Sequence, residues 1–89
     1  HELVDGIDVH IYPNPSMGTF MIDLNSGSDQ SIDIKVFNAL GDLVYTASNV
    51  QFSGKLTKTL DFNSFAEGMY FFQLNTHNML LTKKLIINR

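Results

Sequence analysis

The sequence predicts an all-β fold, either a sandwich or a small barrel, and three observations lead to that prediction. Val, Ile, Thr, Phe and Tyr together account for 28 of the 89 residues, whereas Ala occurs only three times, a balance that favours strands over helices. Apolar and polar residues alternate with a period of two in several short segments. Turn-forming residues separate these segments at regular intervals, which is typical of sandwiches and small barrels.

The turn residues divide the chain into seven predicted strands. These strands cover residues 9–12, 19–25, 31–37, 43–48, 55–62, 69–76 and 79–88. The first strand ends at Pro13-Asn14-Pro15, because proline lacks an amide donor and biases the residue before it toward extended conformations. The second strand follows Gly18, and a polar loop at residues 25–29 separates it from the third. Alternation in these two strands predicts the inward residues Phe20, Ile22, Leu24, Ile32, Ile34 and Val36.

A short turn at residues 38–41 joins the third strand to the fourth. Gly41 occupies its last position, which fits a type I turn followed by a left-handed residue. A second loop, at residues 49–54, precedes the fifth strand. Lys58 interrupts the apolar positions of that strand, so we expect it to lie near a sheet edge.

The last two strands are separated from the fifth by a predicted helical turn. Residues 63–67 form this single turn, which ends at Gly68. In the sixth strand the predicted inward residues are Tyr70, Phe72 and Leu74. Phe71 falls on the opposite face, so Phe71 and also Phe37 are expected to be exposed. Residues 75–78 turn the chain into the last strand, and Asn is expected to supply a positive φ there.

Size and composition limit the classes of function. A chain of 89 residues holds one domain, and without cysteine its stability rests on packing alone. The net charge of −3 is uneven, because residues 1–45 carry seven acids and one base while residues 46–89 carry five bases and two acids. The cationic residues do not form the clustered stripe that binds phosphate backbones, so no nucleic acid partner is expected. No apolar run approaches the roughly 18–20 residues of a membrane span.

The sequence does not predict catalysis. His1, His10 and His77 lie at the terminus, in the first strand and in a hairpin, and none belongs to a nucleophile motif. The oxygen-rich loop at residues 25–29 lacks the spaced acids and the final Glu of a calcium loop, so an ordinary turn is favoured. The aromatic residues between positions 62 and 72 are assigned to core packing in preference to a sugar-stacking platform. We therefore expect no enzyme, no metal and no cofactor.

Several short motifs occur in an order and spacing typical of one family. They are Ile11-Tyr12-Pro13-Asn14-Pro15 with Gly18 and Phe20, Val36-Phe37-Asn38 with Gly41 and Val44, Leu60-Asp61-Phe62 followed by Gly68-Met69-Tyr70-Phe71, and Thr82-Lys83-Lys84-Leu85-Ile86-Ile87. Over about residues 9–89 the chain closely resembles the type A C-terminal sorting domain of the type IX (Por) secretion system of Bacteroidetes.

The resemblance implies an immunoglobulin-like β-sandwich of about seven mainly antiparallel strands, in agreement with the predicted strand count. It further implies a secretion signal that directs an upstream passenger from the periplasm across the outer membrane to the cell surface or the medium. A gingipain-like signal peptidase then usually removes the domain, and the passenger is released or attached to the surface. The implied partners are the type IX translocon, that peptidase and the passenger. Residues 1–8 are interpreted as a linker remnant and residues 9–89 as the sorting domain.

Positions that match the family motifs are the candidate recognition residues. Carried over by position, they are Tyr12, Pro13, Asn14, Pro15, Gly18, Gly41, Val44, Gly68, Tyr70, Lys83, Lys84 and Arg89. We expect the last strand to have a free edge that could accept a strand from a partner. Lys83, Lys84 and the final two residues are expected to contribute little to stability.

One alternative from a different class remains open. It is an immunoglobulin-like adhesion or carbohydrate-binding module of a secreted protein, whose function would lie in loops or on an aromatic face instead of the last strand.

Overall fold

The computed structural model describes residues 2–89, and its regular structure in that range consists of strands alone. The six strands are β1 (Glu2–Val4), β2 (Ile7–Tyr12), β3 (Thr19–Asn38), β4 (Leu43–Asp61), β5 (Gly68–Asn75) and β6 (Leu80–Ile87). The molecule measures 37 × 22 × 18 Å along its principal axes. The predicted all-β class is therefore confirmed.

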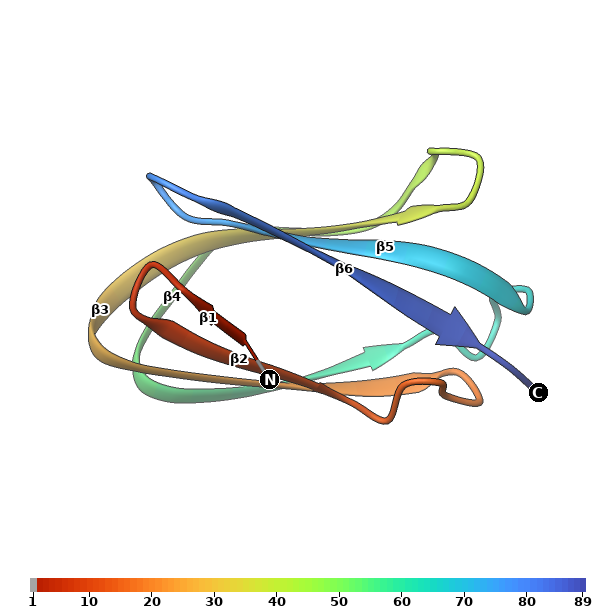
Figure 1. Ribbon diagram of the computed structural model, residues 1–89, viewed down its shortest axis with the longest axis horizontal. Coiled ribbons are helices and arrows are strands. Elements are labelled where there is room, and N and C mark those ends of the chain that lie inside the picture. The colour runs from red at the N-terminus through yellow and green to blue at the C-terminus, as the bar shows by residue number, and fades with distance from the viewer. Residues whose placement is uncertain (1) are drawn as a thin grey trace.

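The two longest strands, β3 and β4, bend so that each runs through both layers of a sandwich (Figure 1). The first half of β3 pairs with β2, which pairs with β1. The second half of β3 pairs with β5, which pairs with β6. β4 pairs with β3 along both halves, and all the strand pairs are antiparallel. The hydrophobic core lies between the two layers thus formed.

The predicted loops at residues 25–29 and 49–54 are corrected by the structure, because both segments are parts of bent strands. Residues 25–29 belong to β3 and residues 49–54 to β4. The β3–β4 register shifts between Ser26 and Gln30, as at a β-bulge, and pairing then resumes. Asn49 and Gly54 take positive φ values of 55° and 76°. Small polar residues that predict a loop thus also suit a bulged bend, which merges four of the seven predicted strands into two.

The core confirms the alternation found in the sequence. Every residue predicted to face inward in the second, third and sixth strands is buried. Phe37 and Phe71, which were expected to be exposed, are half-buried. The reason is that they are direct partners in the β3–β5 ladder, where cross-strand neighbours cover part of each other.

The N-terminal strands begin earlier than predicted. β2 starts at Ile7, and the preceding β1 pairs with it through a turn at Asp5 and Gly6, both with positive φ. Val4 and Ile7 are buried in the core. Residues 2–8 thus add a strand and apolar burial that alternation alone did not reveal.

Two of the three turn predictions are wrong in detail and one is confirmed. Residues 63–67 form no helix, only a turn in which the Phe65 amide donates to the Phe62 carbonyl over 3.0 Å. No Asn in the turn at residues 75–78 has a positive φ, because the Thr76 side chain and backbone close this turn by bonding to Met79. Gly41 does take a positive φ, of 90°.

The edge position predicted for residues 55–62 is confirmed, since β4 pairs only with β3. Lys58 is the register partner of buried Ile22 and therefore lies on the inward side of this edge strand. An inward-pointing charge on an edge strand disfavours pairing with a further strand.

Candidate functional site

Motif residues from three separate parts of the chain meet at one end of the sandwich. We call this region the motif end and define it as residues 13–18, 62–68 and 84–89. In Figure 1 the loop after β2, the turn before β5 and the C-terminus all lie toward the same end of the long axis.

The loop after β2 is fastened to the outer edge of β6. The Asn14 side-chain amide donates to the Lys84 carbonyl over 2.8 Å, and the Ile86 amide donates to Asn14 Oδ1 over 3.0 Å. The Ser16 amide donates to the Ile86 carbonyl over 2.9 Å, and the Asn88 amide donates to the Ser16 carbonyl over 2.8 Å. Asn14 and Ser16 thus occupy the backbone groups that an added strand would need. The prediction of a free edge on the last strand is therefore wrong for residues 84–88.

Arg89 fastens the C-terminus to the turn before β5. Its guanidinium donates to the carbonyl oxygens of Phe62, Asn63 and Phe65, and its amide donates to the Glu67 carboxylate. A planar guanidinium with five donors suits such a cluster of acceptors. We therefore correct the expectation that this terminal residue is surplus to folding, because it closes the turn.

Gly18 lies where the loop after β2 meets Asn63 and Arg89. Its φ is 141°, and a Cβ built on it would lie 2.6 Å from Asn63 Oδ1 and 2.9 Å from Arg89 Nη2. Its carbonyl accepts a hydrogen bond from the Phe62 amide over 2.8 Å. The position therefore requires glycine both for its conformation and for the space.

Tyr70 and two phenylalanines hold the turn before β5 against the core. The Tyr70 hydroxyl donates to the Ala66 carbonyl over 2.7 Å, an arrangement similar to the tyrosine corner of immunoglobulin-like domains. Phe62 stacks on Phe65 with ring centroids 4.8 Å apart, and Phe65 stacks on Tyr70 at 5.9 Å. Gly68, with a φ of 144°, connects this turn to β5. The Gly68-x-Tyr70 spacing thus fixes the shape of the motif end.

Tyr12 lies at the end of β2, on the outer face of the other layer. Its hydroxyl donates to Asp23 Oδ2 over 2.9 Å, and Thr57 donates to Asp23 Oδ1 over 3.1 Å. The hydrogen bond to Asp23 raises the pKa of Tyr12, with desolvation and the carboxylate charge acting in the same direction. Tyr12 thus serves as a donor that positions the start of the Pro13-Asn14-Pro15 loop.

The two lysines of β6 have different surroundings. Lys83 Nζ forms an ion pair with Glu2 Oε1 at 3.3 Å, which connects β6 to β1. Lys84 is exposed, and its side chain forms no hydrogen bond or ion pair within residues 2–89. Of the two, only Lys84 presents an uncommitted charge.

Gly41 and Val44 lie outside the motif end. Gly41 is in the β3–β4 turn, and Val44 is at the start of β4. Asn38 Oδ1 accepts from the amides of Leu40 and Asp42, and Val44 packs on the core. Sequence reasoning missed the contacts of Ser16 and Asn63, which are not among the candidate recognition residues. A signal for Ser16 was present, because Ser two residues before Gly is typical of a hydroxyl-stabilised turn, and Gly18 N–H does donate to Ser16 Oγ over 3.0 Å.

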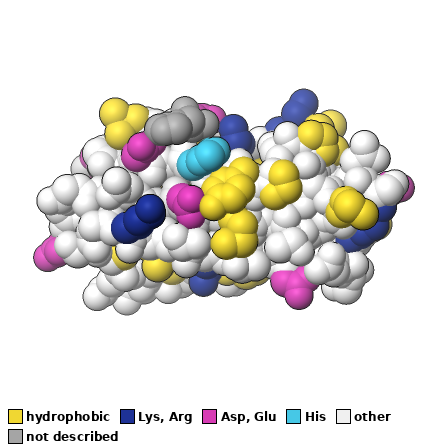
Figure 2. All heavy atoms as spheres, turned by 90° about the horizontal axis from the view of Figure 1, so that it is seen from below, with side chains coloured by type: hydrophobic (Ala, Val, Ile, Leu, Met, Phe, Trp, Pro, Cys, Tyr) yellow, Lys and Arg dark blue, Asp and Glu magenta, His cyan; other side chains and the backbone are white. Residues whose placement is uncertain are grey.

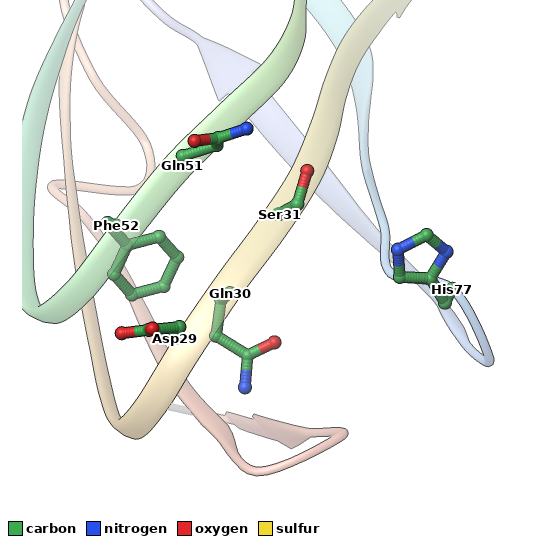
Figure 3. Close-up of a pocket in the computed structure, with 6 residues that line it drawn as sticks. All are labelled: Asp29, Gln30, Ser31, Gln51, Phe52 and His77. Carbon is green, nitrogen blue, oxygen red and sulfur yellow. The ribbon is translucent and has the colours of Figure 1, made fainter.

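A separate hollow lies at the opposite end, where β3 and β4 bend. It has a volume of about 500 Å³ and is lined by Asp29, Gln30, Ser31, Gln51, Phe52 and His77. Figure 3 shows Phe52 and Gln51 on one side of β3 and His77 across from them on the β5–β6 turn. Phe52 packs against the core, so its ring is not a free platform for a sugar. Within residues 2–89 no cluster of three or more His, Asp or Glu could hold a metal, and His1 lies outside the described residues.

Comparison with protein families complements this geometry. A model described as the secretion system C-terminal sorting domain matches residues 10–88. A comparison with curated proteins gives no match. In the described part of the chain there is no helix with the length and apolar character to cross a membrane. Since the family match spans residues 10–88 of the 89 residues, the chain belongs to the family of C-terminal sorting domains of the type IX secretion system.

Proposed function

We propose that the type IX machinery recognises the folded motif end and that the domain thereby directs an upstream passenger out of the periplasm. Membership of the family itself makes the domain a C-terminal sorting signal that interacts with this machinery and is exported across the outer membrane toward the surface or the extracellular space. The family is one of secretion signals and not of enzymes. The proposal adds which part of the fold is recognised.

The observation that carries the proposal is the joining of motifs that lie far apart in the sequence. Asn14 bonds to Lys84, 70 residues away, and Arg89 bonds to Phe62, 27 residues away. A machine that exports many passengers needs a signal independent of them, and this end is held together by contacts within the domain itself. The recognition residues Tyr12, Pro13, Asn14, Pro15, Gly18, Gly41, Val44, Gly68, Tyr70, Lys83, Lys84 and Arg89 are proposed to act by building or displaying that shape.

We further propose two steps after export. A gingipain-like signal peptidase removes the domain by cutting upstream of the first motif, and because β1 and the start of β2 are part of the folded domain, the linker interpretation of residues 1–8 does not extend to residues 2–8. The passenger is then released or attached to the cell surface. Support for both steps comes from the family alone. Sequencing the C-terminus of the secreted passenger tests the first step, because it locates the bond that is cut.

The proposal is tested with a fluorescent protein that is exported to the periplasm and carries residues 1–89 at its C-terminus. In a host with the type IX machinery we expect fluorescence at the cell surface or in the medium, and retention in the periplasm when the outer-membrane translocon is disrupted. Retention of a folded, intact fusion in the competent host would contradict the proposal. Tight binding of the isolated domain to a glycan array would instead favour the carbohydrate-binding alternative.

Lys84→Ala separates recognition from folding. Lys84 has no side-chain partner among the described residues, and an exposed lysine usually changes stability by less than about 0.5 kcal/mol. Lys55→Ala is the matched control, because Lys55 is an exposed lysine of β4 outside the motif end. We expect Lys84→Ala to lower secretion with an unchanged thermal midpoint, and Lys55→Ala to change neither.

A further inference from the structure

The outer face of the layer formed by β6, β5 and the adjoining halves of β3 and β4 carries an apolar patch close to the motif end. The β-ladders place Leu43, Phe37, Phe71 and Lys84 side by side across all four strands. Met69 and Ile86 form the next pair beside them. Leu43 is 50% and Met69 41% exposed, while Phe37, Phe71 and Ile86 are half-buried. We call these five apolar residues the outer patch.

We propose that the outer patch is the surface with which the domain docks on the type IX machinery, against a protein surface that is apolar at its centre and carries carboxylates at its border. This inference rests on the proposed function and adds the face and the chemistry of the partner. Contiguous apolar residues on an exposed sheet face mark interaction sites more often than scattered ones do.

Docking through a face is favoured because both edge strands, β6 and β4, carry features that disfavour strand addition. The outer edge of β6 is occupied by Asn14 and Ser16 from residue 84 onward. β4 has a positive-φ bend at Asn49, where it leaves this layer, and the inward-pointing Lys58 farther along, in the other layer. Both devices disfavour strand addition, so the partner meets side chains and not backbone.

The charges around the outer patch indicate which partner fits. Lys84 borders it on β6, and Lys35 lies in the next row of β3 on the same face. On β3 the nearest carboxylate, Asp33, lies a further row away and accepts a hydrogen bond from the Asn49 amide over 2.7 Å. Two carboxylates lie in the adjoining turns: Asp42 precedes Leu43, and Glu67 is bonded to the Arg89 amide. A second copy of this chain would bring two more lysines to the same face, which like charges disfavour. An anionic lipid surface usually attracts clusters of about four to eight cationic residues, and only two lie here. A protein with acidic side chains around an apolar surface therefore fits best.

The other layer supplies a natural comparison. Figure 2 shows its outer face, where hydrophobic side chains gather beside a histidine and acidic side chains lie close to them. His10 and Tyr12 rings contact there at 4.8 Å, and Tyr12 is bonded to Asp23. Met17, 75% exposed, lies beside Met21 in a hollow at the end of this face. Leu3 of β1, also 75% exposed, lies outside both the outer patch and the motif end and is therefore the exposed apolar control.

The first test compares charge insertions in the fluorescent fusion. Met69→Glu and Leu43→Glu place a carboxylate in the outer patch, and Leu3→Glu places one on the other layer. We expect both patch variants to lower the secreted amount about tenfold, the effect of losing a central interface contact, while the Leu3→Glu control is secreted normally. Thermal midpoints of the isolated domains must stay close to that of the parent. Normal secretion of both patch variants, with the parent still secreted, overturns the outer patch but leaves the proposed function intact.

The second test uses the absence of cysteine from the chain. Met69→Cys and Leu3→Cys each introduce a single thiol, and maleimide labelling is measured in the isolated domain and in a fusion stalled on the translocon by a folded, disulfide-locked passenger. We expect at least tenfold slower labelling at position 69 in the stalled complex and unchanged labelling at position 3. Three results would each contradict the proposed partner. They are labelling at position 69 that is as fast in the stalled complex as in the isolated domain, binding of the isolated domain to vesicles with 30% anionic lipid, and dimers in sedimentation.

Discussion

Gly18→Ala tests the reasoning that the motif end is held by close contacts at one glycine. The new methyl group would lie 2.6 Å from Asn63 Oδ1 and 2.9 Å from Arg89 Nη2, so one or both partners must move. Overpacking of this kind costs about 1–3 kcal/mol, and a non-glycine residue at a φ of 141° adds about 1–3 kcal/mol. The expected loss of about 2–6 kcal/mol is a large part of the roughly 5–13 kcal/mol available to a domain of this size.

Equilibrium unfolding in urea, followed by far-ultraviolet circular dichroism, measures this loss. Two glycine controls separate its causes. Gly41→Ala has a positive φ but nothing within 4 Å of the new Cβ, so we expect only strain, about 1–2 kcal/mol. Gly27→Ala has neither a positive φ nor a close neighbour, so we expect a change within about 1 kcal/mol of zero.

The double variant Gly18→Ala/Asn63→Ala examines the contact itself. Removing the Asn63 side chain removes the shorter clash, so the second substitution should cost less in the Gly18→Ala background than in the parent. An unchanged midpoint for Gly18→Ala, or full additivity in the double variant, would falsify the assignment of Gly18 as a packing-restricted position.

Three further predictions concern the hydrogen bonds of single side chains. Tyr70→Phe keeps the ring but loses the bond to Ala66, and we expect the free energy of unfolding in urea to fall by about 0.5–1.5 kcal/mol; no change would mean that the tyrosine corner contributes nothing. Arg89→Ala should lower it by about 1–3 kcal/mol, because three carbonyl groups lose a charged donor, and an unchanged midpoint would restore the view that this residue is surplus. The raised pKa of Tyr12 means that its bond to Asp23 stabilises the fold below the ordinary tyrosine pKa and that this contribution is lost as the pH rises through the higher folded value. Asp23→Asn should therefore move the Tyr12 contribution to the alkaline absorbance titration at 295 nm to lower pH.

Alternation predicted the core well because the strand period of two holds wherever one face is buried. Phe72 and Leu74, for example, follow the pleat without interruption and are fully buried. The bends at residues 25–30 and 49–54 were harder to interpret, since Gly, Ser and Asn are equally suited to a loop and to a bulge. Pairing with the other long strand decides whether a loop or a bulge forms. The sequence of one segment alone does not reveal that pairing.

The candidate site was predicted only as a set of positions. The motifs named Asn14, Gly18, Lys84 and Arg89, but no physical reason for them could be found in the sequence. Those reasons are contacts between residues far apart in the chain, such as the two hydrogen bonds of the Asn14 amide to β6. Neither periodicity nor composition encodes such contacts, which is why the terminal arginine was first interpreted as dispensable.

The bent pair β3 and β4 also has a consequence for how the domain folds and unfolds. Because each of these strands contributes to both layers, neither layer can come away while the other stays intact. The two strands are consecutive and joined by a short turn, so their pairing closes a small loop and carries a modest entropic cost. We therefore expect a single cooperative transition, in which amide hydrogens in the middle of β2 and of β5 exchange with the same free energy of opening. A sorting domain that unfolds in one cooperative transition is either folded or unfolded, so we expect no partly folded form of it to reach the exporter.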